Sequence, residues 1–335
     1  MKTKILYILV SNETDYYLEM LAISAFSAKQ RMPECHVALL VDDKTNETLN
    51  GKRAELLRGL IDEKVVIDFD PNLNAKRRSR YLKTSMRNHV EGDFIYIDTD
   101  TVIMQPLNDL DNMKEELCAV ADGHSTVKDH HYNRIIVRES GYLNYDITKM
   151  QYYFNGGVIF AKDTKKNREF FARWHEMYKE NIEKIDQDQP SFNKLQQQTN
   201  QIKELPGEYN VQLIVGMHLL SKAKILHFFG VSNYPLLEIS SREFLKAIKE
   251  KGLTAEMKEK IQNPYSTFLP TSTIVRLDDF YFFYSRYYYS GLKRTLISPI
   301  TKVEHFFASI NKWIIIAEYK LLRLIDYITN MKIFH

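Results

Sequence analysis

Short apolar runs alternate with longer amphipathic stretches along the first hundred residues. The short runs are rich in Ile, Val and Leu, as buried strands are, and the longer stretches repeat apolar residues every three or four positions, as helices do. The predicted strands are residues 5–10, 36–41, 64–69 and an apolar run that begins at residue 94 and ends in two carboxylates. The predicted helices are residues 16–30, 50–60 and 76–89. Strands that alternate with helices favour an α/β domain with a mostly parallel sheet.

The strand predicted from residue 94 ends in two carboxylates one residue apart, in Asp98-Thr99-Asp100, and a second apolar pair follows. Strand propensity disfavours Asp, and a buried carboxylate without a partner is costly. Two carboxylates this close repel each other unless a cation lies between or beside them. Because Mg²⁺ and Mn²⁺ prefer oxygen ligands and commonly join carboxylates to phosphates, the pattern predicts a metal site that presents a phosphorylated substrate. The alternative is a strand followed by a turn in which both Asp side chains are solvated.

Further polar residues follow the other predicted strands. Ligands of parallel sheets bind at the carboxyl ends of the strands, so Ser11, Asn12 and Asp42 are expected at the same edge as the Asp pair. No glycine precedes Gly51, which excludes a glycine-rich dinucleotide or P-loop fingerprint on the first strand. Phosphates bound at this edge would be held by a metal and by basic side chains.

Basic residues gather on the helix predicted just before the Asp pair. Lys76, Arg80 and Lys83 share one helical face, and Arg77 lies beside it. A solvated basic face is one interpretation. The functional interpretation makes Arg80 a contact to a diphosphate or a sugar.

Three later segments place polar residues in apolar surroundings. Asn155 and the two glycines after it open an apolar strand, where glycine permits close backbone approach and Asn offers a donor and an acceptor to a polyol. Asp188 and Gln189 begin a predicted helix, so Asp188 either caps that helix or contacts a substrate. His227 ends a short apolar run, where a core histidine with satisfied hydrogen bonds is the alternative to a metal ligand.

Composition and charge narrow the class of protein. The 335 residues suffice for one large α/β domain with an appendage. A net charge of +3 argues against nucleic acid as a partner. Cys35 and Cys118 give neither a disulfide framework nor a zinc spacing, and the amino terminus lacks a secretory pattern, so a cytoplasmic location is expected.

The order of the polar segments is more specific than any one of them. The segments are residues 5–10, Asp98-Thr99-Asp100, Asn155-Gly156-Gly157, Asp188-Gln189-Pro190 with Asn193, residues 205–210 and residues 225–230. This order resembles the family-8 glycosyltransferases, the group of glycogenin and the bacterial lipopolysaccharide galactosyl- and glucosyltransferases, over roughly residues 4–235. The resemblance implies a GT-A fold, which is a single Rossmann-like nucleotide-sugar domain with a mostly parallel mixed sheet. It also implies a Mn²⁺ or Mg²⁺ ion, a nucleotide-sugar donor such as a UDP-sugar, and transfer of a hexose to a glycan or lipid-linked acceptor with retention.

The resemblance assigns roles residue by residue. The metal ligands would be Asp98, Asp100 and His227. The donor contacts would be the Asp pair together with Val10, Ser11, Asn12, Arg77, Arg80, Thr99 and Gly156. The groups nearest the reacting carbon would be Asn155, Asp188 and Gln189.

The sequence departs from the family pattern after the histidine segment. The family continues from Gly with two residues and Lys-Pro-Trp, whereas here Asn233 stands in place of the lysine that would neutralise the diphosphate. Either Arg77 or Arg80 supplies that charge, or catalysis is weak, or the family is a neighbouring GT-A group. Gly156 also replaces a more usual alanine, a small change.

Two other functions are compatible with parts of the sequence. Asp98-Thr99-Asp100 also resembles the motif of haloacid-dehalogenase-like phosphatases, in which Asp98 would be the nucleophile and residues 274–279 a distant acidic pair. That motif normally lies on the first strand of its domain, and this alternative leaves the Asn155 and His227 segments unexplained. The other alternative is a nucleotide-sugar binder without catalysis.

Residues 236–335 are expected to form a helical appendage to a catalytic domain at residues 1–235. One or two charged helices within residues 241–262 would cover the domain. The aromatic residues 281–289 and the amphipathic pattern at residues 303–328 suit peripheral attachment to the inner face of the plasma membrane. Docking on the catalytic domain and formation of a homodimer are the alternatives.

Acceptor specificity is expected to lie in residues 122–145, a polar stretch that contains Gly123-His124-Ser125 and Asp129-His130-His131. Its length and polarity predict a loop that covers the substrate, and a disordered surface loop is the alternative.

Overall fold

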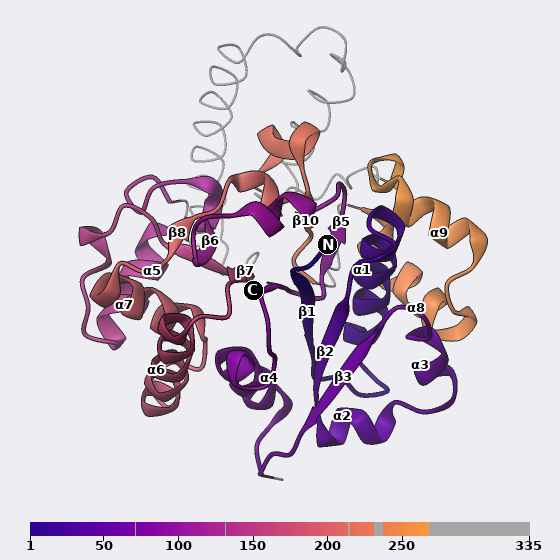
Figure 1. The fold of residues 1–335 in the computed structure, drawn as a ribbon, viewed down its shortest axis with the longest axis horizontal. Helices are drawn as coiled ribbons and strands as arrows, with labels where there is room; N and C mark the ends of the chain where they lie inside the picture. Colours follow the sequence, from indigo (N-terminus) through magenta and orange to yellow (C-terminus); the bar gives the residue numbers. More distant parts are fainter. Residues whose placement is uncertain (71, 131, 214, 231–236, 268–335) are drawn as a thin grey trace, which may run out of the picture.

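A computed structural model describes residues 1–70, 72–130, 132–213, 215–230 and 237–267. A central sheet of seven strands runs in the order β3-β2-β1-β4-β7-β6-β8 (Figure 1). The neighbouring strands from β3 to β4 are parallel, β7 is antiparallel to both β4 and β6, and β8 is parallel to β6. The α/β fold with a mostly parallel mixed sheet is therefore confirmed.

The strands of the central sheet are β1 (Lys4–Leu9), β2 (Val37–Asp42), β3 (Glu63–Ile67), β4 (Phe94–Ile97), β6 (Leu117–Ala121), β7 (Phe154–Ala161) and β8 (Lys203–Glu204). A smaller sheet in the order β5-β10-β9 contains β5 (Thr101–Ile103), β9 (Val211–Gln212) and β10 (Ile225–His227). The apolar run predicted to end in the Asp pair is β4, and the apolar residues that follow the pair form β5 in the smaller sheet.

Helices cover both faces of the central sheet (Figure 1). The α-helices are α1 (Tyr17–Arg31), α2 (Asp43–Thr48), α3 (Gly51–Leu56), α4 (Ala75–Ser85), α5 (Asn133–Tyr142), α6 (Lys165–Asn181), α7 (Gln189–Thr199), α8 (Arg242–Lys251) and α9 (Ala255–Gln262). Helices α1, α8 and α9 pack on one face, and α4, α6 and α7 pack on the other.

The sequence of β1 shows why both faces are covered. Ile5, Tyr7 and Leu9 belong to the core on the α1 side, whereas Leu6 and Ile8 belong to the core on the α4 side. Alternate residues of a strand point to opposite faces, so a strand buried on both sides must be apolar throughout. The continuous apolar run that predicted this strand follows from its place inside the sheet.

The predicted strands and helices of the first hundred residues are all present, with bounds shifted by a few residues. The prediction of a loop over residues 122–145 is wrong, because this stretch contains α5. Ile136 and Ser140 of α5 are buried, and Ile136 packs with Val127, Ile147 and Tyr153 in a small core of its own. The loop prediction missed the apolar spacing within a stretch whose overall composition is polar.

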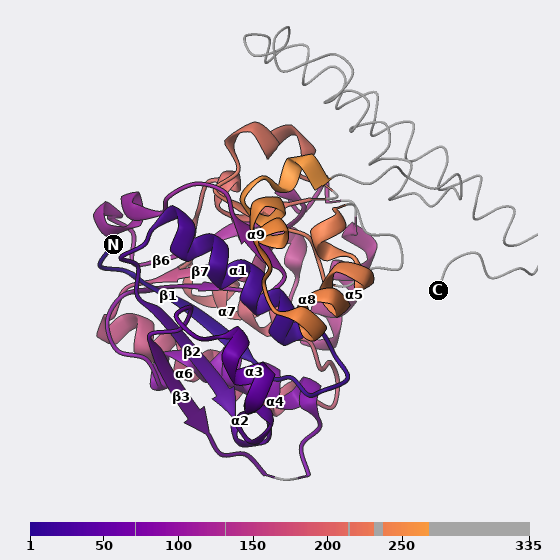
Figure 2. The ribbon, with the colours of Figure 1, turned by 90° about the vertical axis from the view of Figure 1, so that its right-hand side faces the viewer.

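Helices α8 and α9 lie against α1 (Figure 2). Phe244, Leu245 and Ile248 of α8 and Ile261 of α9 join the core on that face, as expected of helices that cover the domain. The division of the chain at residue 235 stays a prediction, because residues 231–236 and 268–335 lie outside the described residues. The aromatic segment and the amphipathic pattern at residues 303–328 lie there too. Within the described part of the chain, no helix has the length and apolar character needed to cross a membrane.

Candidate active site

The topology brings the predicted polar segments to one edge of the sheet. The carboxyl ends of β4 and β6 lie at this edge, and so does the amino end of β7, because β7 runs antiparallel to both. Asp98 follows β4, Asp122 follows β6 and Asn155 lies at the start of β7. The backbone N–H of Asp98 donates to the carbonyl of Gly157 at 2.8 Å, which fixes the Asp pair against β7.

The smaller sheet brings His227 to the Asp pair. β10 pairs antiparallel with β5 so that His227 lies opposite Thr101, the residue after Asp100. The Phe228 N–H donates to the Asp100 carbonyl at 3.0 Å and continues this pairing. His227 Nε2 consequently lies 3.2 Å from Asp100 Oδ1, although the two residues are far apart in the sequence.

Asp98, Asp100 and His227 have the geometry of a cation site. One ligand atom from each lies within 4.8 Å of the other two, and His227 is buried. Two carboxylates and one imidazole are a donor set that suits Mn²⁺ and similar divalent ions. A Cβ added at Gly157 would lie 2.7 Å from His227 Cε1 and 2.9 Å from Asp98 Oδ2, so this glycine keeps open the space in which the three side chains meet. The residues therefore fit the predicted divalent cation.

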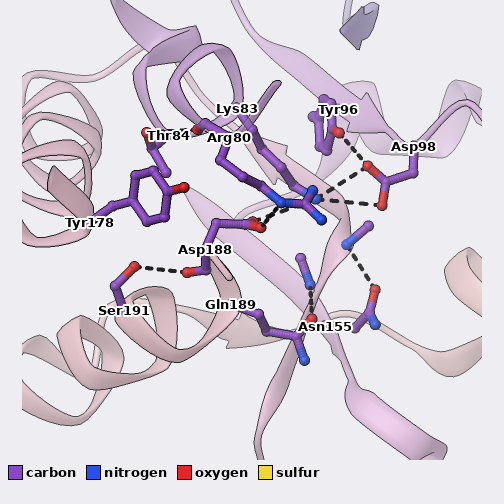
Figure 3. A network of polar contacts seen from close by, with 12 residues as sticks. Arg80, Lys83, Thr84, Tyr96, Asp98, Asn155, Tyr178, Asp188, Gln189 and Ser191 are labelled. Carbon is purple, nitrogen blue, oxygen red and sulfur yellow. Dashed lines mark hydrogen bonds and ion pairs between the residues drawn. The ribbon is translucent and has the colours of Figure 1, made fainter. Parts of the chain in front are cut away.

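One half of the site, which we call the basic half, contains Arg80, Lys83, Asp98 and Asp188 (Figure 3). Lys83 Nζ lies 3.2 Å from Asp98 Oδ1 and 3.6 Å from Asp188 Oδ2, and Arg80 Nε lies 3.0 Å from Asp188 Oδ1. The Tyr96 hydroxyl donates to Asp98 Oδ1. The stripe on α4 is therefore not a solvated basic face at Arg80 and Lys83, because both side chains turn toward the sheet edge.

The surroundings of Asp188 distinguish its two predicted roles, a cap of the helix and a contact to the substrate. It occupies the N-cap position of α7, but its side chain makes no capping hydrogen bond. Burial disfavours its charge, yet Lys83 and Arg80 together lower the pKa of Asp188. Asp188 Oδ2 is buried and has no hydrogen-bond partner among the described residues. This oxygen is an acceptor that a ligand hydroxyl would satisfy.

The other half, which we call the histidine half, contains Asp100, His227, Asn210 and Asn155. His227 Nδ1 lies 3.0 Å from Asn210 Oδ1, and Asn210 Nδ2 donates to Asn155 Oδ1 at 2.9 Å. Asn155 Nδ2 in turn donates to Asp122 Oδ1 at 2.7 Å. The chain of hydrogen bonds thus ends in a carboxylate.

Two groups whose roles as donor and acceptor are known determine the direction of each hydrogen bond in this series. A backbone N–H, that of Gly157, donates to Asn155 Oδ1 at 2.8 Å, and the carboxylate of Asp122 accepts from Asn155 Nδ2. The Asn155 amide therefore has one orientation, which requires Asn210 to present its NH₂ to Asn155 and its oxygen to His227. His227 Nδ1 must then carry a proton. Nε2 is left to face Asp100 and the cation site.

Burial and neighbouring charges shift the pKa values of His227, Asp100 and Tyr96. Burial alone would lower the pKa of His227, but the adjacent Asp100 carboxylate raises it. Burial likewise opposes the charge of Asp100, whose pKa is nevertheless lowered by His227. Burial and the Asp98 carboxylate raise the pKa of Tyr96 well above its usual value, so Tyr96 remains a neutral donor to Asp98.

Gln189 and Gly156 meet at the opening of β7. The Gly156 N–H donates to Gln189 Oε1 at 3.2 Å. A Cβ added at Gly156 would lie 3.5 Å from Asp188 Oδ2, which is an ordinary van der Waals distance. The structure therefore has room for the alanine that is more usual at this position.

The remaining predicted donor contacts other than Thr99 lie apart from the cluster. Val10, Ser11 and Asn12 follow β1 at the same edge, and Ser11 bonds with Thr45, Asp15 and Arg53. Thr99 is buried between the two carboxylates. The structure does not bring Arg77 to the cluster, because its guanidinium pairs with Glu183 at 2.8 Å. Arg77 thus does not supply the missing positive charge in this arrangement.

Several residues of the site had no role in the sequence analysis. Lys83 was placed only on the basic stripe, and Asn210 and Asp122 only within longer segments. Asn210 is fully buried, and the Lys83 side chain is 5% exposed. The signal for Lys83 was its position one turn after Arg80, on the face that α4 turns toward β4. Nothing in the sequence alone indicated the pairing of Asn210 with His227.

Residues 75–238 match a family model described as nucleotide-diphospho-sugar transferase. The matched segment contains every member of both halves of the site. The predicted resemblance to family-8 glycosyltransferases is thereby confirmed, and the match supports a glycosyltransferase. The phosphatase alternative is not supported. No curated protein matches the chain.

The chain is also similar to several solved structures. The galactosyltransferase LgtC, in complex with donor and acceptor sugar analogues, has a TM-score of 0.50 at 16% identity, over 81% of this chain and 98% of that chain. An active-site mutant of LgtC gives 0.50 at 15% identity, over 81% and 98%. The glycosyltransferase GlyE of Streptococcus pneumoniae gives 0.46 at 17% identity, over 82% and 66%. The likeness to LgtC shows that the domain has the GT-A fold.

Proposed function

We propose that the protein transfers a hexose from a nucleotide-diphosphate sugar, such as a UDP-sugar, to a glycan or lipid-linked acceptor, with a divalent cation bound by Asp98, Asp100 and His227. The observation that carries the proposal is the convergence of these three side chains, with ligand atoms within 4.8 Å of one another, at the carboxyl edge of the sheet. A bound Mn²⁺ or Mg²⁺ ion would supply positive charge beside the diphosphate oxygens as the sugar–phosphate bond breaks.

The basic half supports the placement of the donor. Lys83 and Arg80 lie beside the proposed cation site, and both pair with carboxylates. With a diphosphate bound, their ammonium and guanidinium groups can donate to phosphate oxygens and stabilise the departing negative charge. Among the described residues, Lys83 would thus supply the positive charge of the family's lysine, whose position Asn233 occupies in this chain.

The sugar of the donor would lie between Asp188, Gln189 and Asn155. Asp188 Oδ2 is a buried acceptor without a hydrogen bond, which a sugar hydroxyl would complete. Two cations hold the charge of Asp188, which suits an acceptor of hydroxyl groups better than a nucleophile. Retention would then follow from attack on the face from which the diphosphate departs, beside Gln189.

The test is release of UDP from UDP-glucose and UDP-galactose by the full chain, with Mn²⁺ and with a chelator. Asp100→Ala should reduce turnover by at least the roughly 10²–10³-fold that loss of one preorganised electrostatic contact produces. Asp68→Ala is the matched control, because Asp68 is an exposed carboxylate that follows β3, three strands away along the same edge. Circular dichroism checks that both variants fold.

The outcomes separate the alternatives. Turnover that is unimpaired in Asp100→Ala, or unchanged by the chelator, would remove the cation from the proposal. Donor binding with Mn²⁺ but without turnover, measured by thermal shift, would indicate a nucleotide-sugar binder without catalysis.

A further inference from the structure

The loop after β1, residues 10–16, borders the crevice of the proposed donor site. β1 pairs with β2 on one side and with β4 on the other, and helices α1 and α4 lie on opposite faces of the sheet. The winding of the chain therefore reverses between β1 and β4, and ligands of parallel sheets bind at the carboxyl ends of the strands at such a point. The β1 loop, as we call residues 10–16, is next along this edge to the segment after β4 that contains Asp98 and Asp100.

The position of the β1 loop fits the nucleoside end of the donor. In the sheet, β4 lies between β1 and β7. The Asp pair proposed to hold the diphosphate follows β4, and Asn155, one of the groups proposed for the donor sugar, opens β7. A diphosphate links the sugar to the nucleoside, so a donor whose sugar lies toward β7 extends toward β1 with its base and ribose.

Arg53 of α3 holds the first part of the β1 loop. Within the loop, Ser11 Oγ donates to Asp15 Oδ1 at 2.7 Å, and the Asn12 N–H donates to Asp15 Oδ2 at 2.8 Å. Arg53 binds the same two residues from outside, because its Nη1 donates to the Asn12 carbonyl at 2.9 Å and its Nη2 donates to Ser11 Oγ at 3.1 Å. A planar guanidinium fixes the orientation of the groups that it binds through two nitrogens. Arg53 therefore determines where Ser11 and Asn12 lie.

Lys249 of α8 holds the second part of the β1 loop. Its Nζ donates to the Glu13 carbonyl at 2.9 Å and also to the carbonyl of Asp15. The same Nζ lies 4.7 Å from the centre of the Tyr16 ring, which is a cation–π distance. Helices α3 and α8 both pack against α1, and so the two cations reach the loop from the helical layer on one face of the sheet (Figure 1).

Glu19 anchors both cations. It lies in the first turn of α1, is 1% exposed, and has its Oε1 3.9 Å from Lys249 Nζ. Burial raises the pKa of Glu19, whereas a backbone hydrogen bond and the charges of Lys249 and Arg53 oppose this rise. Its Oε2 is buried and has no hydrogen-bond partner among the described residues, so its charge is balanced mainly by these two cations.

A cavity of about 380 Å³ lies between α1, α3 and the end of α8, and Glu19, Arg53 and Lys249 all line it. The other carboxylates of the lining pair with other cations, Glu55 with Arg58 and Glu250 with Lys246. Because open space lies beside the two cations that bind the β1 loop, hydrogen bonds and charge, and not close packing, hold the loop from this side.

We propose that Arg53 and Lys249, anchored by Glu19, are positioning residues for the nucleoside end of the donor. They hold the β1 loop in the arrangement that receives the base and ribose, while the cation site holds the diphosphate. The inference rests on the proposed function, and it gives α3 and α8 a role in donor binding from behind the loop.

The test measures binding to the full chain in the presence of Mn²⁺ by isothermal titration calorimetry. The probes are UDP, CDP, GDP, ADP and dTDP, of which the tightest is used for the variants, and inorganic pyrophosphate, which lacks a nucleoside. Lys249→Met should raise the Kd of the nucleoside diphosphate about tenfold, as expected if the competent arrangement of the loop falls to about a tenth of the population. The Kd of pyrophosphate should not change. For hydrolysis of the matching nucleotide sugar, KM should rise while kcat stays the same.

Lys246→Met is the matched control. Lys246 lies on the same helix, its side chain is 65% exposed, and it pairs with Glu250, so both Kd values should equal those of the wild type. Lys249→Arg should restore most of the nucleoside diphosphate affinity, because a guanidinium keeps the charge and the donors to the carbonyls. Arg53→Met acts on the other part of the loop and should reproduce the difference between the two probes. Circular dichroism checks folding, and Arg53→Met decides the matter if Lys249→Met does not fold.

Two results would overturn the inference. One is a nucleoside diphosphate Kd that is the same in the wild type and in the Met variants of Lys249 and Arg53. The other is a rise in the pyrophosphate Kd as large as that for the nucleoside diphosphate, which would assign the effect to the structure as a whole. A wild-type protein that binds neither pyrophosphate nor any nucleoside diphosphate with Mn²⁺ would instead strike the proposed function.

Discussion

The basic half and the histidine half of the site are built from opposite kinds of contact. The basic half is a group of ion pairs, in which two cations from α4 share two carboxylates. The histidine half is a chain of mostly neutral hydrogen bonds that ends on a carboxylate at one side and on the proposed cation site at the other. Both halves meet at the opening of β7.

The difference indicates which half a donor would rearrange. Ion pairs can exchange partners, because a diphosphate offers Lys83 and Arg80 the same kind of anionic oxygen that the two carboxylates offer now. Hydrogen bonds whose direction is fixed by a backbone N–H cannot be exchanged without leaving a buried group unsatisfied. We therefore expect the basic half to respond to ligands and the histidine half to remain as it is.

Lys83→Met should produce the largest effect in this comparison. Its removal takes away the proposed phosphate contact and leaves Asp98 and Asp188 without their shared cation, so kcat/KM for donor turnover should fall roughly 10²–10³-fold. Because Mn²⁺ no longer competes with Lys83 for Asp98, the ion should raise the melting temperature of the variant more than that of the wild type. Turnover and thermal shift with and without Mn²⁺ measure both effects.

Arg77→Met is the control for Lys83→Met. Arg77 lies on the same helix, but its partner Glu183 is mostly exposed, and exposed ion pairs contribute little. Donor turnover should stay near the wild-type value. A loss as large as that of Lys83→Met would mean that Arg77 moves into the site on donor binding, as the sequence analysis expected.

The sequence predicted those strands and helices whose buried residues form a clear apolar pattern along the chain. β2 is buried along its whole length, β1 is buried at every residue after Lys4, and α4 opens with a cap from Asn74, so their patterns are clear in the chain itself. Asp98 and Asp100 stand out in the sequence because they end an apolar strand, whereas the family resemblance grouped His227 with them. The structure brings the three side chains together, and their roles as metal ligands stay predictions.

The remaining residues could not be predicted because their roles depend on contacts between distant segments. Asn210 looks like an ordinary loop residue until β9 and β10 place it beside His227. Helix α5 was predicted as a loop because its exposed face is rich in charge, and only its packing on Tyr153 shows which residues are buried. Segments of this kind need tertiary structure before their function can be inferred.

Asn210→Ala should break the histidine half while sparing the ion pairs. Without the Asn210 oxygen, the Nδ1 proton of His227 is no longer held, and loss of such an outer partner typically weakens metal affinity roughly 10–100-fold. Nitrogen chemical shifts of the His227 ring, measured in the protein without metal, should show a protonated Nδ1 in the wild type and a partly unprotonated Nδ1 in the variant. Unchanged shifts would contradict the direction that we derived for the hydrogen-bond chain.

Gly156 and Gly157, at the opening of β7, give the smallest expected difference between the two halves. They are neighbours in the sequence, but Gly156 faces the basic half and Gly157 faces mainly the histidine half. A Cβ at Gly157 would lie within 3.0 Å of His227, Asn155 and Asp98, so Gly157→Ala should destabilise the protein by about 1–3 kcal/mol, as overpacking does. A Cβ at Gly156 has only ordinary contacts, at 3.5 Å and beyond, to Asp188 and Lys83. Gly156→Ala should therefore keep its wild-type stability in denaturant unfolding and its Mn²⁺ affinity, while Gly157→Ala loses both. Equal behaviour of the two variants would mean that β7 shifts enough to absorb the methyl group, and that the histidine half is less rigid than its hydrogen bonds require.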